Sequence, residues 1–598
     1  MLKDVYDKYI LGIAVGIKDC SVTLVKGSNV IVVAFESEFS KVSKDCDLPY
    51  FAIKNVLKKN NLSLNKIDHI VYSRNPRVNF KEILVRYIFK NYGNLSSFIN
   101  YDYKLFKDNF FFQKKIINNL LKIHKQFDNN NSINFSKKFF KELSFKISFI
   151  NSDIAGCGGC FYPSKFKESA ILICDDEHPT PLFTMAHGID KRIKIISSLN
   201  FVNNFISFRK AFFLIFKKPN ENFLTSKFSE KQQEICDNFI KENILNYKEN
   251  GAIIFKKKNF IIKGNQLFFS NKLKSEIANL AVNFSDQQQF LNCFFKSYFS
   301  VEYQLIISSL RYLKKITKCD NLVINNNKIF DESLLIKIKN LKIFENIWVQ
   351  NLSDAGLYAF GCSLVKSHFN LNYSRSFAFK NNYTINTNCY GQNFSNDEIK
   401  NNLDCFGSNY LLIDDEKNLG NILTQNLSQD KIIACNFGKF QFNDKAFDTR
   451  GIWFAVDMST SIKLSEFLLR DFNVVFCRGE FLDFYDIKTN QYNLLSYIEK
   501  CSKITNDISL VINNKKLKPT YSLNQIDNRI IYQIVQNFYR QNNNKILLNF
   551  PWLLTNNQLS YGFSDYLQFF KNYPIDILTI ENYVLFKEDQ FFEKISNV

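Results

Sequence analysis

The chain is poor in the residues that mark unusual architectures. Of its 598 residues, only 19 are glycine, 9 are proline and 3 are tryptophan. A collagen-like chain or a low-complexity chain rich in proline and glycine is therefore excluded. Hydrophobic residues make up 46% of the sequence and aromatic residues 16%, which is far more than a disordered chain contains. We predict a globular protein, and we attribute its excess of phenylalanine, lysine and asparagine to coding bias.

Long apolar runs and an export signal are also missing. The most apolar helical segments, such as residues 211–216, are far shorter than the roughly 18–20 residues that span a bilayer. The first residues, MLKDVY, lack a charged segment followed by an apolar stretch and a cleavage site. We therefore expect a cytoplasmic protein with no membrane partner.

The cysteines lack the regular spacing of a small disulfide-rich secreted domain. There are 14 of them, and all are scattered except Cys157 and Cys160. This distribution favours a reducing compartment. The close pair allows two interpretations: a surrogate metal or redox site together with Asp153, or two small residues packed in a glycine-rich turn. A single Cys-x-x-Cys does not decide between them, because a structural zinc ion needs four ligands.

The charge is strongly positive but dispersed. Lysine and arginine number 77 against 57 acidic residues, which gives a net charge of +20 and permits partners that bear phosphate. The short basic runs at residues 256–258 and 515–516 have no interleaved aromatic residues, so they favour solvated faces over a nucleic-acid patch. Nucleic acid is thus a less favoured partner than a nucleotide.

The length and the apolar pattern predict two α/β domains. A chain of 598 residues exceeds the roughly 250–300 residues at which a single core stops growing. Periodicity weakens at residues 367–388, where we place the boundary between the domains. Helix-like segments at 397–403, 418–427 and 463–469 alternate with strand-like segments in the second domain. Residues 100–145 have helical spacing and indicate an insertion in the first domain.

The first domain begins in the order expected of an actin-like, nucleotide-handling fold. Apolar runs at 9–15, 21–25 and 30–35 predict three adjacent strands, and they precede a helix at 50–60 and a strand at 69–72. In that superfamily the first turn carries an aspartate that faces a phosphate or a metal, and Asp19 occupies the turn here. An ordinary hairpin aspartate is the alternative. Farther along, strands are predicted at 169–174 and 321–324, and a long helix at 287–317.

Several segments in a shared order extend these predictions to a family. They are YILGI at 9–13, FSKV at 39–42, IDHIVY at 67–72, CFYPS at 160–164, FENIWVQ at 344–350, DAG at 354–356, YGQ at 390–392 and FSNDEI at 394–399. In these segments the chain resembles the O-carbamoyltransferases of nodulation-factor and antibiotic biosynthesis, from Tyr9 to about Phe586. The resemblance implies an actin-like (ASKHA) N-terminal domain at 1–370, a linker at 371–388, and a YrdC-like α/β C-terminal domain at 389–598.

The resemblance also implies a chemistry and its partners. The C-terminal domain makes carbamoyl adenylate from the co-substrates ATP and carbamoyl phosphate, and the N-terminal domain transfers the carbamoyl group to a hydroxyl of a small metabolite. An iron-type divalent metal polarises the adenylate in the family. A homodimer is compatible with the sequence, which does not fix the oligomeric state.

The family's metal site is the first place where this chain differs. Its aspartate matches Asp354, but its pair of histidines four residues apart aligns with Ser152 and Gly156, with Asp153 between them. Neutral imidazoles are the usual transition-metal ligands, and neither serine nor glycine supplies one. Lys18 replaces a further histidine in the first turn. Asp354 and Asp153 are the metal-binding residues that we predict.

The nucleotide-binding positions differ as well. The family's two glycines after a strand align with Asn325 and Asn326, which places side chains where the adenylate would lie. In the C-terminal domain, its run of arginines aligns with Lys439, Lys445 and Arg450. Lysines neutralise phosphate as point charges, whereas an arginine fork binds it in a bidentate manner. Phosphate contact and a solvated basic loop both remain open for these cations.

Two weaker matches complete the predicted set. Thr520 and Arg529 align with the loop that binds carbamoyl phosphate in the family. The chain is thus a divergent O-carbamoyltransferase with Lys445, Arg450 and Asp19 as catalytic residues and Lys439, Asn325, Asn326, Thr520 and Arg529 as binding residues, or a pseudoenzyme that binds a nucleotide, metabolite or protein without catalysis. An anion-binding protein that uses the positive charge is a third and weaker alternative.

Overall fold

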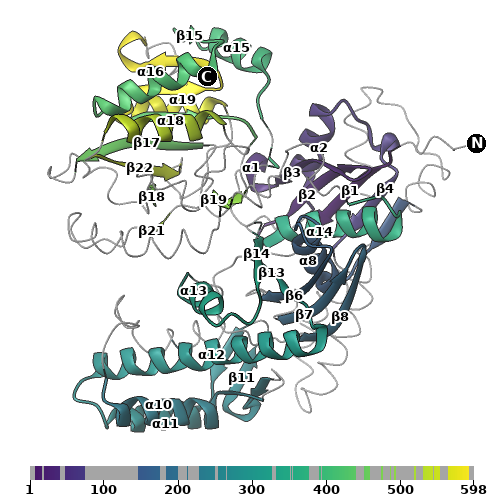
Figure 1. Ribbon diagram of the computed structural model, residues 1–598, viewed down its shortest axis with the longest axis vertical. Helices are drawn as coiled ribbons and strands as arrows, with labels where there is room; N and C mark the ends of the chain where they lie inside the picture. Colours follow the sequence, from purple (N-terminus) through teal and green to yellow (C-terminus); the bar gives the residue numbers. More distant parts are fainter. Residues whose placement is uncertain are drawn as a thin grey trace, which may run out of the picture. The chain divides into compact units, whose positions relative to one another are not determined.

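The structure is a computed structural model (Figure 1). The described residues are 7–15, 19–40, 48–73, 146–174, 183–199, 212, 228–248, 253–263, 266–325, 332–350, 352, 354–375, 390–391, 393–439, 450–457, 473–475, 485–486, 491–492, 518–519, 529–542, 545–551 and 563–590. The predicted insertion at 100–145 and the predicted helix at 463–469 lie outside them. Most of the predicted linker at 371–388 also lies outside the described residues.

The chain forms two compact units. The first contains residues 1–70, 351–363 and 373–598, and the second contains residues 71–350 and 364–372. Each unit is built around mixed α/β structure. No helix among the described residues is both long enough and apolar enough to cross a membrane.

The first five-stranded sheet begins with the three predicted adjacent strands. β1 (Tyr9–Ala14), β2 (Ser21–Lys26) and β3 (Asn29–Phe35) form an antiparallel meander. β4 (His69–Tyr72) and β5 (Ile147–Phe149) continue the sheet on the far side of β1, which gives the order β3-β2-β1-β4-β5. The short helix α1 (Ser37–Ser40) and α2 (Tyr50–Lys59) follow β3, so the predicted β-β-β-α-β order is confirmed.

The second five-stranded sheet repeats this arrangement. β6 (Glu168–Cys174), β7 (Phe183–Ile189) and β8 (Arg192–Leu199) form another antiparallel meander. β13 (Asn321–Asn325) lies parallel to β6 on its other side, and β14 (Asn346–Gln350) lies parallel to β13. The order β14-β13-β6-β7-β8 therefore matches that of the first sheet, strand for strand.

Helix α8 (Ser152–Phe161) corrects one prediction, because the Cys157–Cys160 segment is helical and not a turn. Glycine normally costs about 1 kcal/mol in a helix relative to alanine. Here Gly156, Gly158 and Gly159 are all buried, and the helix packs on the strands of the second sheet. Close packing of a small-residue helix offsets its low propensity, and the sequence pattern alone does not show this.

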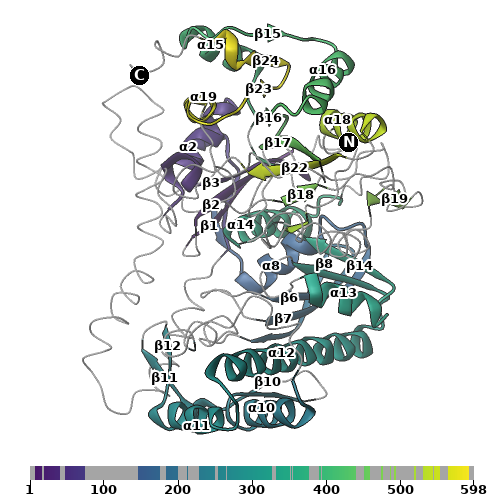
Figure 2. The same ribbon diagram turned by 90° about the vertical axis from the view of Figure 1, so that its left-hand side faces the viewer.

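A helical layer completes the second unit. Its members are α10 (Glu230–Asn243), α11 (Asn271–Ala281), the long α12 (Gln287–Thr317) and α13 (Glu332–Asn340), with the small hairpins β9 (Leu245–Tyr247) and β10 (Ile253–Phe255), and β11 (Phe260–Lys263) and β12 (Gln266–Phe269). Figures 1 and 2 both show α10 and α11 beside α12. Asp286 caps α12 by accepting the Gln289 N–H, so the predicted helix at 287–317 is confirmed.

α14 (Asp354–Val365) packs tightly against β1 in the first unit. A Cβ at Gly12 would lie 2.8 Å from the Cβ of Ser363, which is closer than side chains approach, so glycine is required for this contact. A π-helical turn, η4 (Lys366–Asn370), follows α14.

The C-terminal part of the first unit contains an eight-stranded sheet of order β15-β24-β23-β16-β17-β22-β18-β21. Its strands are β15 (Leu411–Leu412), β16 (Ile433–Asn436), β17 (Arg450–Asp457), β18 (Asn473–Val475), β21 (Lys518–Pro519), β22 (Lys545–Pro551), β23 (Ile577–Ile580) and β24 (Tyr583–Phe586). A separate hairpin joins β19 (Tyr485–Asp486) to β20 (Gln491–Tyr492).

Helices cover both faces of the eight-stranded sheet. Ala434 and Leu578 pack with α15 (Asn396–Cys405) and α19 (Phe563–Asn572), whereas Ile433 and Ile577 pack with α16 (Glu416–Ser428) and α18 (Arg529–Gln541). Successive residues of a strand point to opposite faces, so each strand supplies both cores. The result is a three-layer arrangement, and the α/β class predicted for this part of the chain is confirmed.

Candidate functional site

The connection between β16 and β17 contains the three predicted cations. Asn436, the last residue of β16, is the cross-strand partner of Arg450, the first residue of β17. Lys439 follows Asn436 by three residues, and Lys445 falls in residues 440–449, outside the described part. β16 runs parallel to β23, and ligands of α/β sheets commonly bind at the carboxyl ends of such strands. We refer to residues 437–449 and Arg450 as the β16–β17 loop.

Gly438 gives this loop an open stretch of backbone. Its φ of +68° lies in the left-handed region that glycine adopts without strain. No described atom lies within 4 Å of the position that a Cβ would take. The Gly438 N–H donates to Glu581 Oε1 at 2.7 Å, which fixes the loop to the turn between β23 and β24. A ligand could therefore approach the main chain at Gly438 closely.

Two further polar groups lie at this edge. The Lys439 ammonium donates to the carbonyl of Ile31 in β3 at 3.0 Å, which positions its charge beside the first sheet. The side chain of Asn436 is buried, and its amide nitrogen has no hydrogen-bond partner among the described residues. Buried polar groups are normally bonded, so Asn436 Nδ2 is a donor suited to a ligand. Glu581 and Asn436 were not predicted, because their proximity to the loop depends on the pairing of β16 with β23.

Asp19 lies between β1 and β2, as predicted. Its Oδ1 accepts the Cys20 N–H at 2.8 Å, and its Oδ2 accepts the hydroxyl of Ser37 at the start of α1. Asp19 thus ties the first hairpin to the chain segment that follows β3. The neighbouring Lys18 lies outside the described residues.

Asn325 is the last residue of β13, and its side chain is buried within the second sheet. Its Oδ1 accepts the N–H of Cys174 at 3.0 Å, and its Nδ2 donates to the carbonyl of the same residue at 2.7 Å. The carboxamide therefore extends the pairing of β6 with β13 at their carboxyl ends. Asn326, the other predicted binding residue here, lies outside the described residues.

The residues of α8 do not fit the family's metal. Ser152 and Gly156 lie one turn apart, where histidines on a helix share one face. The Ser152 hydroxyl donates to the carbonyl of Ser73 at 2.9 Å, and Gly156 has no side chain. Asp153 is half-buried, which raises the pKa of its carboxyl group above the ordinary value, and its Oδ1 accepts the Ile154 N–H.

The two cysteines of α8 do not replace the missing imidazoles. Cys157 and Cys160 are fully buried, and burial raises the pKa of both thiols well above the usual range. Among the described residues, their sulfur atoms and the Asp153 carboxylate do not form a group compact enough to hold a metal ion. Three other predicted site residues can be placed only along the chain. Asp354 is the first residue of α14 and Arg529 the first residue of α18, and neither side chain is described. Thr520 lies outside the described residues.

Comparisons with known proteins relate part of the chain to a family. Residues 9–384 match the family described as carbamoyltransferase N-terminus. An uncharacterized protein of Synechocystis sp. (strain ATCC 27184 / PCC 6803 / Kazusa), sll1178, is 31% identical over 91 residues, which span 15% of this chain and 15% of that relative's length. A ligand-bound xylulose kinase from Lactobacillus acidophilus aligns with 62% of this chain and 91% of its own at 12% identity and a TM-score of 0.27.

Proposed function

Because the chain belongs to the carbamoyltransferase family, we propose that it is a divergent ATP-dependent O-carbamoyltransferase. It would transfer a carbamoyl group from carbamoyl phosphate, through carbamoyl adenylate, to a hydroxyl of a small metabolite. The observation that supports this most directly is the β16–β17 loop, where Lys439 follows an open, positive-φ glycine at the carboxyl end of β16 and Arg450 begins the paired strand β17. We further propose that the duplicated sheets form an actin-like domain and that the eight-stranded sheet forms a YrdC-like one.

The residues of the loop would act on phosphate charge. Arg450 would bind a phosphate of ATP or carbamoyl phosphate through its planar fork, and Lys439 and Lys445 would neutralise the departing pyrophosphate. The main chain at Gly438 would approach the nucleotide. These contacts strengthen as negative charge develops on the leaving group, and this differential binding accelerates the reaction.

The second half-reaction would take place in the N-terminal domain. The acceptor's hydroxyl oxygen would bond to the carbamoyl carbon of the adenylate, the bond from that carbon to the phosphate oxygen would break, and AMP would leave as the hydroxyl proton is lost. Asp19 would face the phosphate or the acceptor from the first hairpin. No step here uses a metal, because the residues of α8 do not fit the family's ion.

A pseudoenzyme is the second candidate, and a specific observation favours it. In the N-terminal domain, Ser152 and Asn325 replace family groups and are bonded to the carbonyl of Ser73 and to the main chain of Cys174. Their polar atoms thus stabilise the fold. On this alternative the domain would bind a nucleotide, a metabolite or a protein without turnover.

The test is pyrophosphate release from ATP in the presence of carbamoyl phosphate. We expect release by the parent protein, and a fall of about 10- to 100-fold in Lys445→Ala, because a charge-assisted contact is worth about 1.5–3 kcal/mol. Lys400→Ala, at an exposed position of α15, is the matched control and should keep the parent rate. Equal rates in both variants would remove the proposed role of the loop. If the parent protein shows neither turnover nor an ATP-dependent thermal shift, both the enzyme and the nucleotide-binding pseudoenzyme are contradicted.

A further inference from the structure

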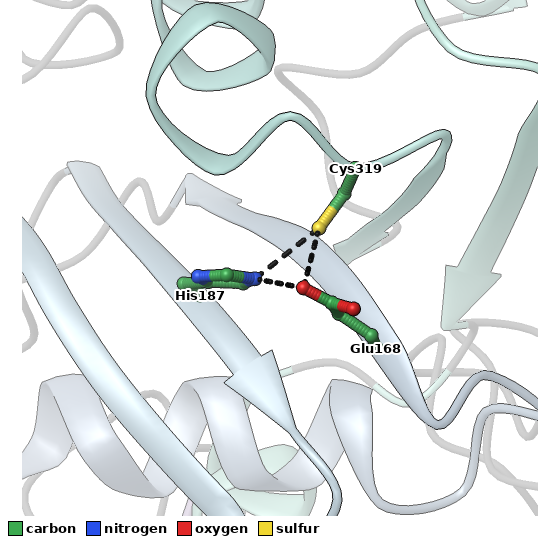
Figure 3. A group of neighbouring side chains, drawn as sticks. All are labelled: Glu168, His187 and Cys319. Atoms are coloured by element: carbon green, nitrogen blue, oxygen red, sulfur yellow. Dashed lines mark hydrogen bonds and ion pairs between the residues drawn. The ribbon is translucent and has the colours of Figure 1, made fainter.

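Three side chains that play no part in the proposed transfer converge at one point of the second sheet. The Nε2 of His187 lies 2.9 Å from Oε1 of Glu168 and 3.2 Å from Sγ of Cys319, and Sγ lies 3.5 Å from the same Oε1 (Figure 3). Among the described residues, this is the group of histidine, cysteine and acidic side chains compact enough to hold a metal ion. We call Glu168, His187 and Cys319 the amino-edge cluster.

Strand register brings the first two residues together. Glu168 is the first residue of β6, and His187 lies in β7 opposite Ala170, two positions farther along β6. Residues two apart in a strand share a face, so Glu168 and His187 are diagonal neighbours on one face. The antiparallel pairing of β6 and β7 therefore fixes the distance between carboxylate and imidazole.

The end of α12 delivers the third residue. Lys318 has a φ of 56°, and its N–H donates to the carbonyl of Lys314 at 2.8 Å, which ends the helix in a left-handed cap. The chain then turns toward β13, and Cys319 points its sulfur at the two strands (Figure 3). An element far away in the sequence thus completes the cluster.

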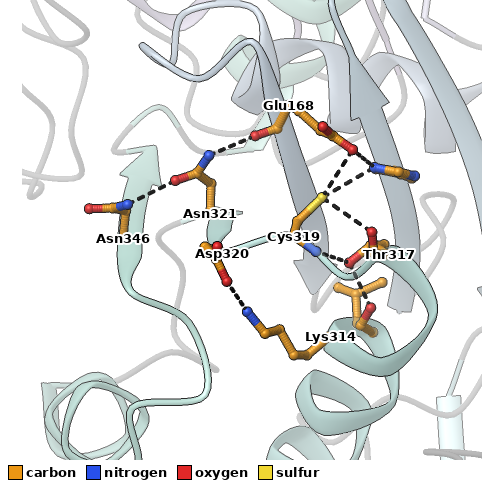
Figure 4. Close-up of polar contacts among 9 residues, drawn as sticks. Glu168, Lys314, Thr317, Cys319, Asp320, Asn321 and Asn346 are labelled. Carbon is orange, nitrogen blue, oxygen red and sulfur yellow. Dashed lines mark hydrogen bonds and ion pairs between the residues drawn. The ribbon is translucent and has the colours of Figure 1, made fainter.

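Polar contacts hold this arrangement in place (Figure 4). Asn321 Nδ2 donates to the main-chain carbonyl of Glu168 at 2.9 Å, and Asn346 Nδ2 donates to Asn321 Oδ1 at 2.9 Å. Lys314 forms an ion pair with Asp320, directly after Cys319. The backbones that present Glu168 and Cys319 are therefore fixed to the same strands, so the cluster is organised before any ligand arrives.

The three polar atoms of the cluster face a common point. Both the Glu168 oxygen and the Cys319 sulfur approach the same imidazole nitrogen. When no cation is bound, Nε2–H can donate to Glu168 Oε1, while the Cys319 thiol donates to the same oxygen or to the carbonyl of Thr317 at 3.6 Å. A cation between the three atoms would replace these hydrogen bonds and bind all three atoms at once.

The geometry points to a site for one divalent cation of the zinc type, bound by Glu168 Oε1, His187 Nε2 and Cys319 Sγ. With metal–ligand distances of about 2.3 Å for sulfur and 2.0–2.1 Å for nitrogen and oxygen, neighbouring ligands of a tetrahedral ion lie about 3.3–3.6 Å apart. The observed separations of 2.9, 3.2 and 3.5 Å reach these values after shifts of a few tenths of an ångström. A thiolate, an imidazole and a carboxylate together suit zinc better than magnesium or calcium.

The site is open on one side. The side chain of Glu168 is 53% exposed and that of His187 18%, whereas Cys319 is only 7% exposed. Three protein ligands with a solvent-facing fourth position leave room for a water molecule. The ion would join β6, β7 and the connection from α12 to β13 at the amino ends of β6 and β13. Asn325 and Cys174 lie at the opposite ends of these strands, so the site is separate from the predicted nucleotide-binding edge.

A reactive cysteine is the competing explanation of the same residues. Burial, followed by the neighbouring Glu168 carboxylate, raises the pKa of Cys319 to about 11. The free thiol is thus protonated at neutral pH, whereas nucleophilic cysteines have lowered pKa values. A reactive thiolate is thus disfavoured, whereas the three interatomic distances support metal ligation.

The experiment measures bound metal on untagged full-length protein. After loading with Co²⁺ or Zn²⁺ and removal of excess ion, we expect one equivalent per chain and, with Co²⁺, a thiolate charge-transfer band in the near ultraviolet. Cys319→Ser should abolish the band, and Cys319→Ser, His187→Gln and Glu168→Gln should each weaken binding at least tenfold. Glu168→Gln alters a half-exposed side chain, so it remains informative if the other two variants fail to fold.

Two controls separate this site from other ligands of the chain. Cys405→Ser removes an exposed thiol elsewhere and should keep the full equivalent and the band. Asp153→Asn alters the predicted family metal site and should do the same. No stoichiometric metal in the parent protein, or an unchanged metal content in all three cluster variants, would overturn the proposal. Neither readout depends on turnover, so the result is independent of the proposed carbamoyl transfer.

Discussion

Helix α8 and the β16–β17 loop have departed from the family pattern in different ways. In α8 the positions that the resemblance aligns with the family's histidines are occupied by a serine bonded to the main chain and by a glycine buried in the packing. In the loop, lysine stands for arginine twice, and Arg450 remains. By this alignment the helix lacks the family's imidazoles, whereas the loop retains three basic residues.

This difference shows that the two proposed half-reactions need not have changed together. Replacing a histidine by glycine removes a ligand atom that no neighbour restores, while replacing arginine by lysine retains the charge and loses only the bidentate geometry. We therefore expect the chain to retain the formation of carbamoyl adenylate more fully than a transfer step that depends on a metal ion. The predictions below test each side of the comparison, from the largest effect to the smallest.

Asn325→Leu should be the most damaging change on the N-terminal side. It would leave the N–H and the carbonyl of Cys174 buried without their partner, and each unsatisfied group costs about 1–3 kcal/mol. Urea denaturation should show a loss of about 2–4 kcal/mol in unfolding free energy. Asn346→Leu, at an exposed position with one hydrogen bond, should change it by less than about 1 kcal/mol. A small loss of unfolding free energy in Asn325→Leu would contradict this structural role and favour the predicted binding role of Asn325.

Arg450→Met should reduce ATP-dependent pyrophosphate release by about 10- to 100-fold, because it removes a charged contact to phosphate. Arg450→Lys should fall between the parent and Arg450→Met, since lysine restores the charge without the fork. Thermal melts of both variants check that the loss is one of activity and not of folding. A parent-like rate in Arg450→Met would mean that the loop is merely solvated.

Gly438→Ala should affect both stability and activity. A residue with a Cβ pays about 1–2 kcal/mol in the left-handed region. Gly407 has a φ of 62° in the same part of the chain, so Gly407→Ala should show a comparable loss of stability. Only Gly438→Ala should also lower pyrophosphate release, measured well below both melting temperatures. Equal activity in the two variants would speak against nucleotide contact at Gly438.

Asp153→Asn should have the smallest effect and should be stabilising at neutral pH. Burial holds the folded-state pKa of this carboxyl group above its unfolded value, so ionising it costs stability as the pH rises through that window. Asparagine avoids this cost and can still accept the Ile154 N–H. The melting temperature of the variant should exceed that of the parent at pH 8, and the difference should shrink as the pH is lowered through the raised folded-state pKa toward the ordinary pKa of an aspartate. A lower melting temperature at pH 8 would contradict this.

Elements with a regular apolar pattern could be predicted well from the sequence. The 31 residues of α12, the meander of β1 to β3 and the strands β6 and β13 lie where their periodicity places them. Each has a period that its own residues reveal. α8 could not be predicted in this way, because three glycines in ten residues are typical of a turn. Only the surface on which these glycines pack makes the helix stable.

The candidate sites were harder to predict from the sequence for a similar reason. Lys439 and Arg450 could be predicted because one short segment contains them. Asn436 approaches Glu581 only through the pairing of distant strands, and Cys319 approaches Glu168 through the end of α12. Such proximity depends on topology, and no local spacing in the sequence encodes it.

The repeated strand order has a consequence for the timing of folding. Both meanders join consecutive strands and can form from local contacts, but each sheet also needs a later strand beside its first one. β3 ends at Phe35 and β4 begins at His69, whereas β8 ends at Leu199 and β13 begins only at Asn321. Since closing a longer loop is slower, we expect amide protons of β4 to be protected before those of β13 in pulse-labelled refolding. The pairing of β1 with β4 in the first sheet would thus form before the matching pairing of β6 with β13 in the second.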